Sequence, residues 1–313
     1  MTLRIACFGL PLAAYLLAKD GHDVRFSVLA PIDAPGRRRL ARQIGPERIL
    51  DARALGEGLE SCVEETLARE QPELIVSWFW TRRLPARWLA RARHGGIGAH
   101  PSLLPRHRGP NPYFAAIDAG DEQTGVTIHR LTAEYDDGDI LLSRALPVGA
   151  LDAWQLARAL DRPSLALIRE AARGFATGQP PIGTTQRGEL ASWAPEPTGE
   201  ALRATWTWPS ARVLRRVRAL SPVPGLGLEL EGLPLSVTRA EPTNRYPSAL
   251  EPGEAAVYGD PATLVLRTGD GAIAITRAVL ETADDEPVQL LDRQELATTV
   301  ARHLAHRNAG RLG

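Results

Sequence analysis

The chain has 313 residues, of which 44% are hydrophobic and 24% charged, the balance of an ordinary globular protein with room for two domains. Basic and acidic residues number 37 each, so the net charge is zero, which argues against a strongly electropositive nucleic-acid-binding protein but permits a local basic patch. Cys7 and Cys62 have neither metal-ligand spacing nor a disulfide framework around them, which favours a reducing cytoplasm.

Residues 1–24 contain an apolar run that resembles the start of a signal peptide. Gly9 and Pro11 interrupt this run, and Lys19 to His22 end it like a helix, so the segment predicts a strand, a turn and a helix. The turn lacks the G-x-G-x-x-G fingerprint, and nicotinamide binding is therefore not expected. No apolar run reaches the roughly 18 residues of a membrane span, so no membrane partner is expected.

Short apolar runs alternate with helix-patterned segments through the first half of the chain. The runs are near-continuous, as expected for strands covered on both faces, and lie at residues 3–9, 23–30 and 73–79. Segments with helical spacing separate them, at residues 12–21, 36–45 and 57–70. This alternation predicts an α/β fold, a Rossmann-like and mostly parallel sheet with helices on both faces. Two further strands are expected, and then two helices on either side of Pro163, at residues 125–131, 139–148, 151–160 and 164–175.

The composition changes after Gly178. Residues 178–199 are rich in Pro, Gly and Thr and are interpreted as a linker between domains 1–177 and 200–313. The second domain begins with an amphipathic helix and continues with alternating strands, among which Asp270-Gly271 is a strong hairpin signal. A small C-terminal antiparallel β-barrel, OB-like and closed by a helix over residues 293–306, is the predicted architecture.

Two residues in the first domain could carry acid–base chemistry. His100 follows the short apolar segment GGIGA, which places it at the carboxyl end of a strand, where open α/β sheets bind ligands. Asp136 lies in another strand-connecting loop, beside Asp137 and a turn-forming Gly138. A carboxylate that orients an imidazole and raises its pKa suits general acid–base catalysis. Taken alone, such a pair is more often structural than catalytic.

Three motifs give these residues a context. The runs HPSLLPRHRG, GDEQTGVTIHRL and YDDGDIL resemble the folate-dependent formyltransferase family, which includes methionyl-tRNA formyltransferase and glycinamide ribonucleotide formyltransferase. The run VRALSPVPG is similar to the pattern that opens the small barrel of the tRNA enzyme, so the layout resembles that branch most closely. The resemblance covers nearly the whole chain.

The resemblance implies a reaction and its catalytic groups. The family transfers a formyl group from 10-formyltetrahydrofolate to an amine, and His100 and Asp136 match its catalytic histidine and aspartate. The histidine, held protonated by the aspartate, would stabilise the oxyanion and return a proton to the departing folate nitrogen. Neither a metal nor a covalent intermediate is required.

The resemblance also implies a folate pocket with two walls. One wall is the loop that matches the family's pterin-binding segment, Trp80, Thr81, Arg82, Arg83 and Leu84. The other is the segment Leu131 to Tyr135, including Glu134. His129 matches a histidine of the purine-pathway enzymes and is either a partner of the catalytic groups or a core histidine. Asp137 and Asp139 are interpreted as turn formers, and Ser102 as a loop-capping hydroxyl.

One position departs from the family pattern. The family has a catalytic asparagine two residues before the histidine, and this chain has Gly98. Loss of one such oxyanion donor costs about 10²–10³ in rate, or roughly 3–4 kcal/mol. Three interpretations stay open: water or a side chain such as Asn111 or His129 replaces the donor; the space admits a different acyl group or a bulkier acceptor; or the protein is a catalytically impaired folate- or RNA-binding relative. Replacement of the donor ranks first.

The acceptor amine is the remaining question. A basic segment, Ala34 to Gln43, lies where the tRNA enzyme has a tRNA-binding loop, and it carries Arg37, Arg38, Arg39 and Arg42. From Glu200 onward, however, acidic and basic residues nearly cancel, and residues 281–287 form an acidic run, which weakens the case for tRNA. The acceptor is therefore expected to be either a small-molecule amine or the initiator tRNA.

Overall fold

The computed structural model describes residues 1–33, 35–280 and 288–310. The chain forms two compact units. The first comprises Met1–Pro112, Gln123–Pro147 and Arg158–Pro195, and the second comprises Tyr113–Glu122, Val148–Ala157 and Glu196–Gly313. The acidic run expected at residues 281–287, together with Ala34 of the basic segment, lies outside the described residues.

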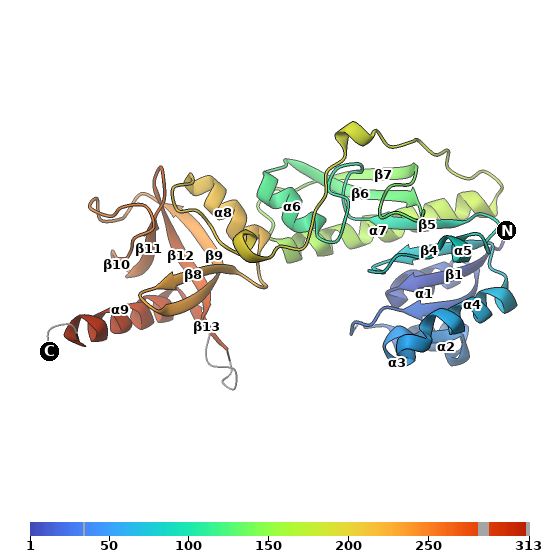
Figure 1. Ribbon diagram of the computed structural model, residues 1–313, viewed down its shortest axis with the longest axis horizontal. Helices are drawn as coiled ribbons and strands as arrows, with labels where there is room; N and C mark the ends of the chain where they lie inside the picture. The colour runs from blue at the N-terminus through green and yellow to red at the C-terminus, as the bar shows by residue number, and fades with distance from the viewer. Residues whose placement is uncertain (34, 281–287, 311–313) are drawn as a thin grey trace. The chain divides into compact units, whose positions relative to one another are not determined.

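The first unit is built on a seven-stranded sheet with the order β3-β2-β1-β4-β5-β6-β7 (Figure 1). The first five strands in this order are parallel to one another, and β6 and β7 continue the sheet antiparallel. The α/β prediction is thus confirmed. The strands are β1 Arg4–Gly9, β2 Asp23–Leu29, β3 Ile49–Asp51, β4 Leu74–Trp78, β5 Gly96–His100, β6 Gln123–Arg130 and β7 Ile140–Pro147.

Helices cover both faces of this sheet (Figure 1). On one face, alternate strand residues such as Phe8, Phe26 and Ile75 pack with Val63 and Trp88 from the helices above them in one buried cluster. Alternation of this kind places every second side chain of a strand on the same face. The helices of this unit are α1 Pro11–Lys19, α2 Arg37–Ile44, α3 Ala52–Leu55, α4 Leu59–Glu70, α5 Ala86–Leu89 and α7 Ala153–Ala176, whose first five residues belong to the second unit. Helix α6 Pro112–Ala119 belongs to the second unit from Tyr113 onward.

Helix α7 differs from the sequence prediction. Two helices separated at Pro163 were expected, and the structure has a single helix of 24 residues with Pro163 inside it. A proline inside a helix removes one backbone hydrogen bond, at a cost of about 3 kcal/mol. Buried leucines on both sides of the proline, Leu160 and Leu165, hold the helix together despite that loss.

The second unit contains a curled antiparallel sheet with the order β10-β11-β12-β9-β8, to which β13 adds along β12. This confirms a small antiparallel C-terminal domain, and the predicted hairpin at Asp270-Gly271 connects β11 to β12. Helices α8 and α9 contribute Val213, Val217 and Leu296 to its core. The elements are α8 Ser210–Ala219, β8 Leu226–Leu230, β9 Leu233–Thr243, β10 Ala255–Tyr258, β11 Thr263–Arg267, β12 Ala272–Leu280, β13 Gln289–Asp292 and α9 Arg293–Gly310.

None of the helices in the described ranges combines the length and the apolar composition that a bilayer span requires.

Candidate active site

His100 is the last residue of β5, at the carboxyl edge that the five parallel strands share. The strand carries two glycines because its neighbours approach closely. A Cβ added to Gly96 would lie 2.9 Å from Leu131 Cδ1, and one added to Gly98 would lie 2.8 Å from Leu131 Cδ2 and 3.1 Å from His129 Nε2. The small residues before His100 therefore make room for side chains of the adjacent strand and its loop.

Both nitrogens of the His100 ring have partners. Nε2 lies 2.7 Å from the carbonyl oxygen of His107, and Nδ1 lies 3.4 Å from Asp136 Oδ2. The side chain is 6% exposed, so the imidazole is held in a largely desolvated position. The structure thus brings together the two residues that the sequence predicted to be catalytic.

Asp136 is held in a strained and well-supported conformation. Its φ of 53° is in the left-handed region, which non-glycine residues seldom adopt. Oδ2 accepts a hydrogen bond from the backbone N–H of Gly109 (2.9 Å), and Oδ1 lies 3.5 Å from His129 Nε2. A backbone outlier beside a buried imidazole is the kind of arrangement found where function constrains the chain.

His129 lies in β6, directly opposite Gly98 in β5. Its Nδ1 is 2.9 Å from the carbonyl oxygen of Arg130, and its side chain is 3% exposed. Burial lowers the pKa of this ring to about 4, against the opposing attraction of the Asp136 carboxylate. His129 therefore contacts the predicted catalytic aspartate and occupies the space beside Gly98.

A segment that the sequence analysis interpreted as linker supports this site. Residues 184–194, which we call the strap, belong to the first unit. Gln186 Nε2 donates to the carbonyl oxygens of Asp136 (2.8 Å) and Gly138 (2.7 Å), and Gln186 Oε1 accepts from Arg108. Ser192 Oγ accepts from the backbone N–H of His107 (2.9 Å). The strap thus fixes both loops that hold His100 and Asp136.

The two predicted walls of the folate pocket lie against each other. Leu84, Trp80 and Leu131 pack in one apolar cluster. Arg83 lies 3.5 Å from Glu134 in an ion pair and over the ring of Tyr135. Thr81, Arg82 and Arg83 are exposed. The indole N–H groups of Trp80 and Trp88 are buried without a hydrogen-bond partner among the described residues.

The remaining polar residues of the motifs have structural contacts. Asp137 forms an ion pair with Arg108 at 2.5 Å, and the Ser102 hydroxyl donates to the carbonyl oxygen of Arg106 (2.6 Å). The backbone N–H of Asn111 donates to the carbonyl oxygen of Ala194, at the end of the strap.

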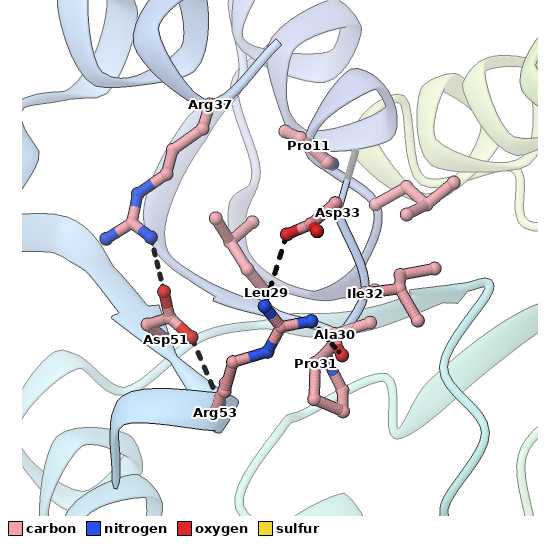
Figure 2. A pocket seen from close by; sticks show the side chains of 11 residues that line it. Pro11, Leu29, Ala30, Pro31, Ile32, Asp33, Arg37, Asp51 and Arg53 are labelled. Atoms are coloured by element: carbon pink, nitrogen blue, oxygen red, sulfur yellow. Dashed lines mark hydrogen bonds and ion pairs between the residues drawn. The ribbon is translucent and has the colours of Figure 1, made fainter. Parts of the chain in front are cut away.

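A hollow of about 110 Å³ lies at the carboxyl ends of β1, β2 and β3 (Figure 2). Two ion pairs line it, between Arg37 and Asp51 and between Arg53 and Asp33, the latter at 3.2 Å. Arg53 also donates to the carbonyl oxygen of Pro31. The hollow opens on the same edge of the sheet that carries His100, and one arginine of the predicted basic segment is part of its wall.

Comparison with known proteins bears on both units. The family model for formyl transferase matches residues 15–161, and that for the formyl transferase C-terminal domain matches residues 198–291. Methionyl-tRNA formyltransferase of Anaeromyxobacter dehalogenans is 34% identical over 292 residues, covering 89% of this chain and 93% of that protein. The same enzyme of Bordetella petrii is 31% identical over 315 residues, covering 93% and 96%.

Two solved structures share the fold. HypX from Aquifex aeolicus, in complex with tetrahydrofolic acid, superposes with a TM-score of 0.65 at 21% identity; the match covers 95% of this chain and 47%, about half, of HypX. An N-formyltransferase from Helicobacter canadensis, in complex with folinic acid and dTDP-3-aminofucose, gives 0.63 at 13% identity, covering 87% and 98%. Given the relatives above 30% identity along nearly their whole length, the chain belongs to the folate-dependent formyltransferase family, whose members are one-carbon transferases.

Proposed function

We propose that the protein transfers the formyl group of 10-formyltetrahydrofolate to an amine, with His100 and Asp136 as its catalytic groups. The observation that carries the proposal is the 3.4 Å approach of His100 to Asp136 at the carboxyl edge of β5. The amine attacks the formyl carbon, and negative charge develops on the formyl oxygen. His100 Nε2–H, which donates to the His107 carbonyl in the structure, changes partner and stabilises that oxygen.

We place the folate at the two loops that follow β4 and β6. Residues 80–84 and 131–135 are in contact through apolar packing and the ion pair of Arg83 with Glu134. The strap residue Gln186 keeps Asp136 in its unusual backbone conformation while the substrates exchange.

Methionyl-tRNA is the first candidate acceptor. Its support is that the two relatives described above are methionyl-tRNA formyltransferases and that their similarity spans both units. The exposed basic helix α2 is the candidate contact in the first unit, since no ion pair of Arg38 or Arg42 is found within the described ranges.

A small-molecule amine is the second candidate, and two observations favour it. The arginines of α8 are engaged within the second unit: Arg216 pairs with Asp118 at 2.6 Å, Arg212 stacks on Trp208, and Arg218 donates to backbone carbonyls. The buried Arg216 is therefore not presented to nucleic-acid phosphates, whereas Arg212 remains exposed beside Trp208. The hollow in Figure 2 is also of a size for part of a small molecule.

The experiment is an assay of tetrahydrofolate release by the purified chain with 10-formyltetrahydrofolate and either methionyl-tRNA or a panel of amino sugars and amino acids. His100→Ala should lower kcat by about 10²–10⁴, the usual contribution of a positioned proton donor, while folate still binds. The control is His22→Ala. His22 is a buried histidine that follows α1 and accepts a hydrogen bond from the backbone N–H of Leu3.

Three results would contradict the proposal. Near-full activity of His100→Ala would exclude the proposed catalytic group. Folate binding without turnover for every amine would identify a catalytically impaired folate- or RNA-binding relative. Turnover with another acyl donor, and none with the formyl donor, would mean that the site transfers a different group.

A further inference from the structure

A single carboxylate, that of Asp136, faces two imidazoles. Oδ2 lies 3.4 Å from His100 Nδ1, and Oδ1 lies 3.5 Å from His129 Nε2. The two rings are nearly perpendicular, with their centroids 6.5 Å apart, and both are buried. A carboxylate in this position can exchange a proton with either ring, so the location of the protons decides what the cluster of His100, Asp136 and His129 does.

In each ring, a backbone carbonyl determines the protonation of the nitrogen that does not face Asp136. His100 Nε2 lies 2.7 Å from the carbonyl oxygen of His107, and His129 Nδ1 lies 2.9 Å from that of Arg130. A carbonyl oxygen only accepts hydrogen bonds, so each of these nitrogens is assigned a hydrogen. In a neutral ring, the nitrogen that faces Asp136 is consequently a proton acceptor.

The surroundings of His129 keep its ring neutral at pH 7. Burial is the main cause that lowers its pKa to about 4; the carboxylate of Asp136 opposes this, and the His100 ring and Arg108 lower the pKa further. His129 Nε2 and Asp136 Oδ1 then face each other as two acceptors, and their 3.5 Å separation is longer than the hydrogen bonds around them. A proton between these two atoms would replace the repulsion of two acceptors with a hydrogen bond.

Gly98 and His129 are matched across the two strands. They are direct partners in the β5–β6 pairing, and a Cβ at position 98 would lie 3.1 Å from His129 Nε2. A side chain at position 98 would crowd the one nitrogen of this ring that can accept a proton. The glycine thus permits the position that His129 occupies beside Asp136.

We propose that Asp136 Oδ1 and His129 Nε2 together take up the proton that the amine loses, while His100 supplies the proton that the folate nitrogen gains. This inference rests on the proposed function. It assigns the accepting and donating roles to two different histidines that share one carboxylate, in the way that differing environments separate the acid and the base of other enzymes. His129 acts through Asp136 and is a positioning residue for the proton.

The protons balance over one turnover. The amine nitrogen forms a bond to the formyl carbon, becomes positively charged and releases one proton to Asp136 Oδ1, where His129 Nε2 shares it. The bond between the formyl carbon and the folate nitrogen breaks, and that nitrogen receives one proton from His100. His100 starts with a hydrogen on both nitrogens and gives up the one on Nε2, while Nδ1–H continues to face Asp136. The proton held by Asp136 and His129 is then released to water, and His100 Nε2 takes up one proton from water, which restores the starting state.

The proton state itself is testable without an acceptor amine. Histidine ¹⁵N NMR of the full chain at pH 7, with His129→Asn to assign the signal, should show His129 as a neutral ring with its hydrogen on Nδ1. A ring protonated on both nitrogens, or on Nε2 alone, would overturn the inference.

Two variants then separate a proton-holding role from a structural one. His129→Asn retains an amide donor for the Arg130 carbonyl but has no acceptor at the level of Nε2, and we expect kcat to fall about 100-fold. His129→Gln places an amide at the level of Nε2 and loses the anchor to Arg130, and it should be the more active but the less stable of the two. A purely structural role predicts that activity follows the melting temperature in both variants.

The controls keep this test separate from that of the proposed function. His22→Asn removes a buried histidine outside the cluster and should leave kcat unchanged. If the unmodified chain releases no tetrahydrofolate with any amine, the proposed function fails, and the NMR measurement still decides the proton state. If the unmodified chain is active and His129→Asn keeps near-full kcat, only the role of His129 fails.

Discussion

Two side chains, Leu131 and His129, lie where a side chain at position 98 would otherwise be. The pairing of β5 with β6 places His129 opposite Gly98, and the loop after β6 brings Leu131 over the same position. Protein interiors are close-packed, so an added group at such a position has to displace its neighbours. A substitution at position 98 is therefore coupled to the identity of residues 129 and 131.

The coupling predicts the outcome of restoring the family's asparagine. Gly98→Asn should lower kcat and destabilise the protein by about 1–3 kcal/mol, because the new Cβ would lie 2.8 Å from Leu131 and 3.1 Å from His129. The measurements are steady-state kinetics and urea unfolding. Gly58→Asn is the matched control, since a Cβ at Gly58 meets nothing within 4 Å. A large gain in formyl transfer by Gly98→Asn would show instead that the site is only impaired.

At the scale of elements, the strap connects the two loops of the site. Its residue Gln186 makes contacts on both sides, to the carbonyl oxygens of Asp136 and Gly138 and to the guanidinium of Arg108. Arg108 in turn pairs with Asp137. The conformation of Asp136, with φ at 53°, depends on these contacts because its own backbone does not favour it.

Removal of the strap contact should affect turnover more than folding. Gln186→Leu removes the donor to two carbonyl oxygens and one acceptor of the Arg108 guanidinium, which keeps its ion pair with Asp137, at a cost of about 1–3 kcal/mol. With Asp136 less firmly held, kcat should fall while the KM for the folate changes less. Glu189→Gln, which alters an exposed ion pair of the same segment, is the control. Equal kcat for Gln186→Leu and the unmodified chain would show that the loops hold Asp136 without the strap.

The strands and the position of His100 could be predicted from the sequence because both depend on local patterns of apolar residues. Buried parallel strands are continuous apolar runs, and His100 ends one of them at the carboxyl edge, where open α/β sheets bind ligands. Asp136 follows β6, which runs antiparallel to β5, so its approach to His100 depends on the fold of the loop after β6 and was expected from the family motif. The contact of His129 with Asp136 depends on the register between β5 and β6, which is not a local property. The strap was not predictable because a polar, Pro-rich segment that packs on a surface has the composition of a linker. Helix α7 continued through Pro163 because of packing that the sequence alone does not reveal.

Over the whole molecule, the distribution of charge predicts a limited affinity for RNA. The formal net charge is zero, and the arginines of α8 are engaged in contacts within their own unit. Arg37 pairs with Asp51, and Arg39 lies over the ring of Tyr15. Within the described part of the chain, this leaves Arg38 and Arg42 as the cations of α2 without a recorded ion pair or ring contact.

If α2 alone contacts the phosphates, Arg38 and Arg42, its two cations without an ion pair among the described residues, predict a weak dependence of tRNA affinity on salt. Each phosphate contact contributes about 0.7–0.9 to the slope of log affinity against log salt concentration, so two contacts give a slope near −1.6. Raising the salt from about 50 to 200 mM should then weaken methionyl-tRNA binding by about tenfold, against 10³–10⁵-fold for a protein with six to ten phosphate contacts.

Replacing Arg38 and Arg42 with alanine should flatten the dependence of affinity on salt. The control variant Arg216→Ala should change stability rather than the slope, because its guanidinium is bound to Asp118 and two backbone carbonyls. A steep slope that survives the double replacement would mean that nucleic acid binds through charges other than those of α2.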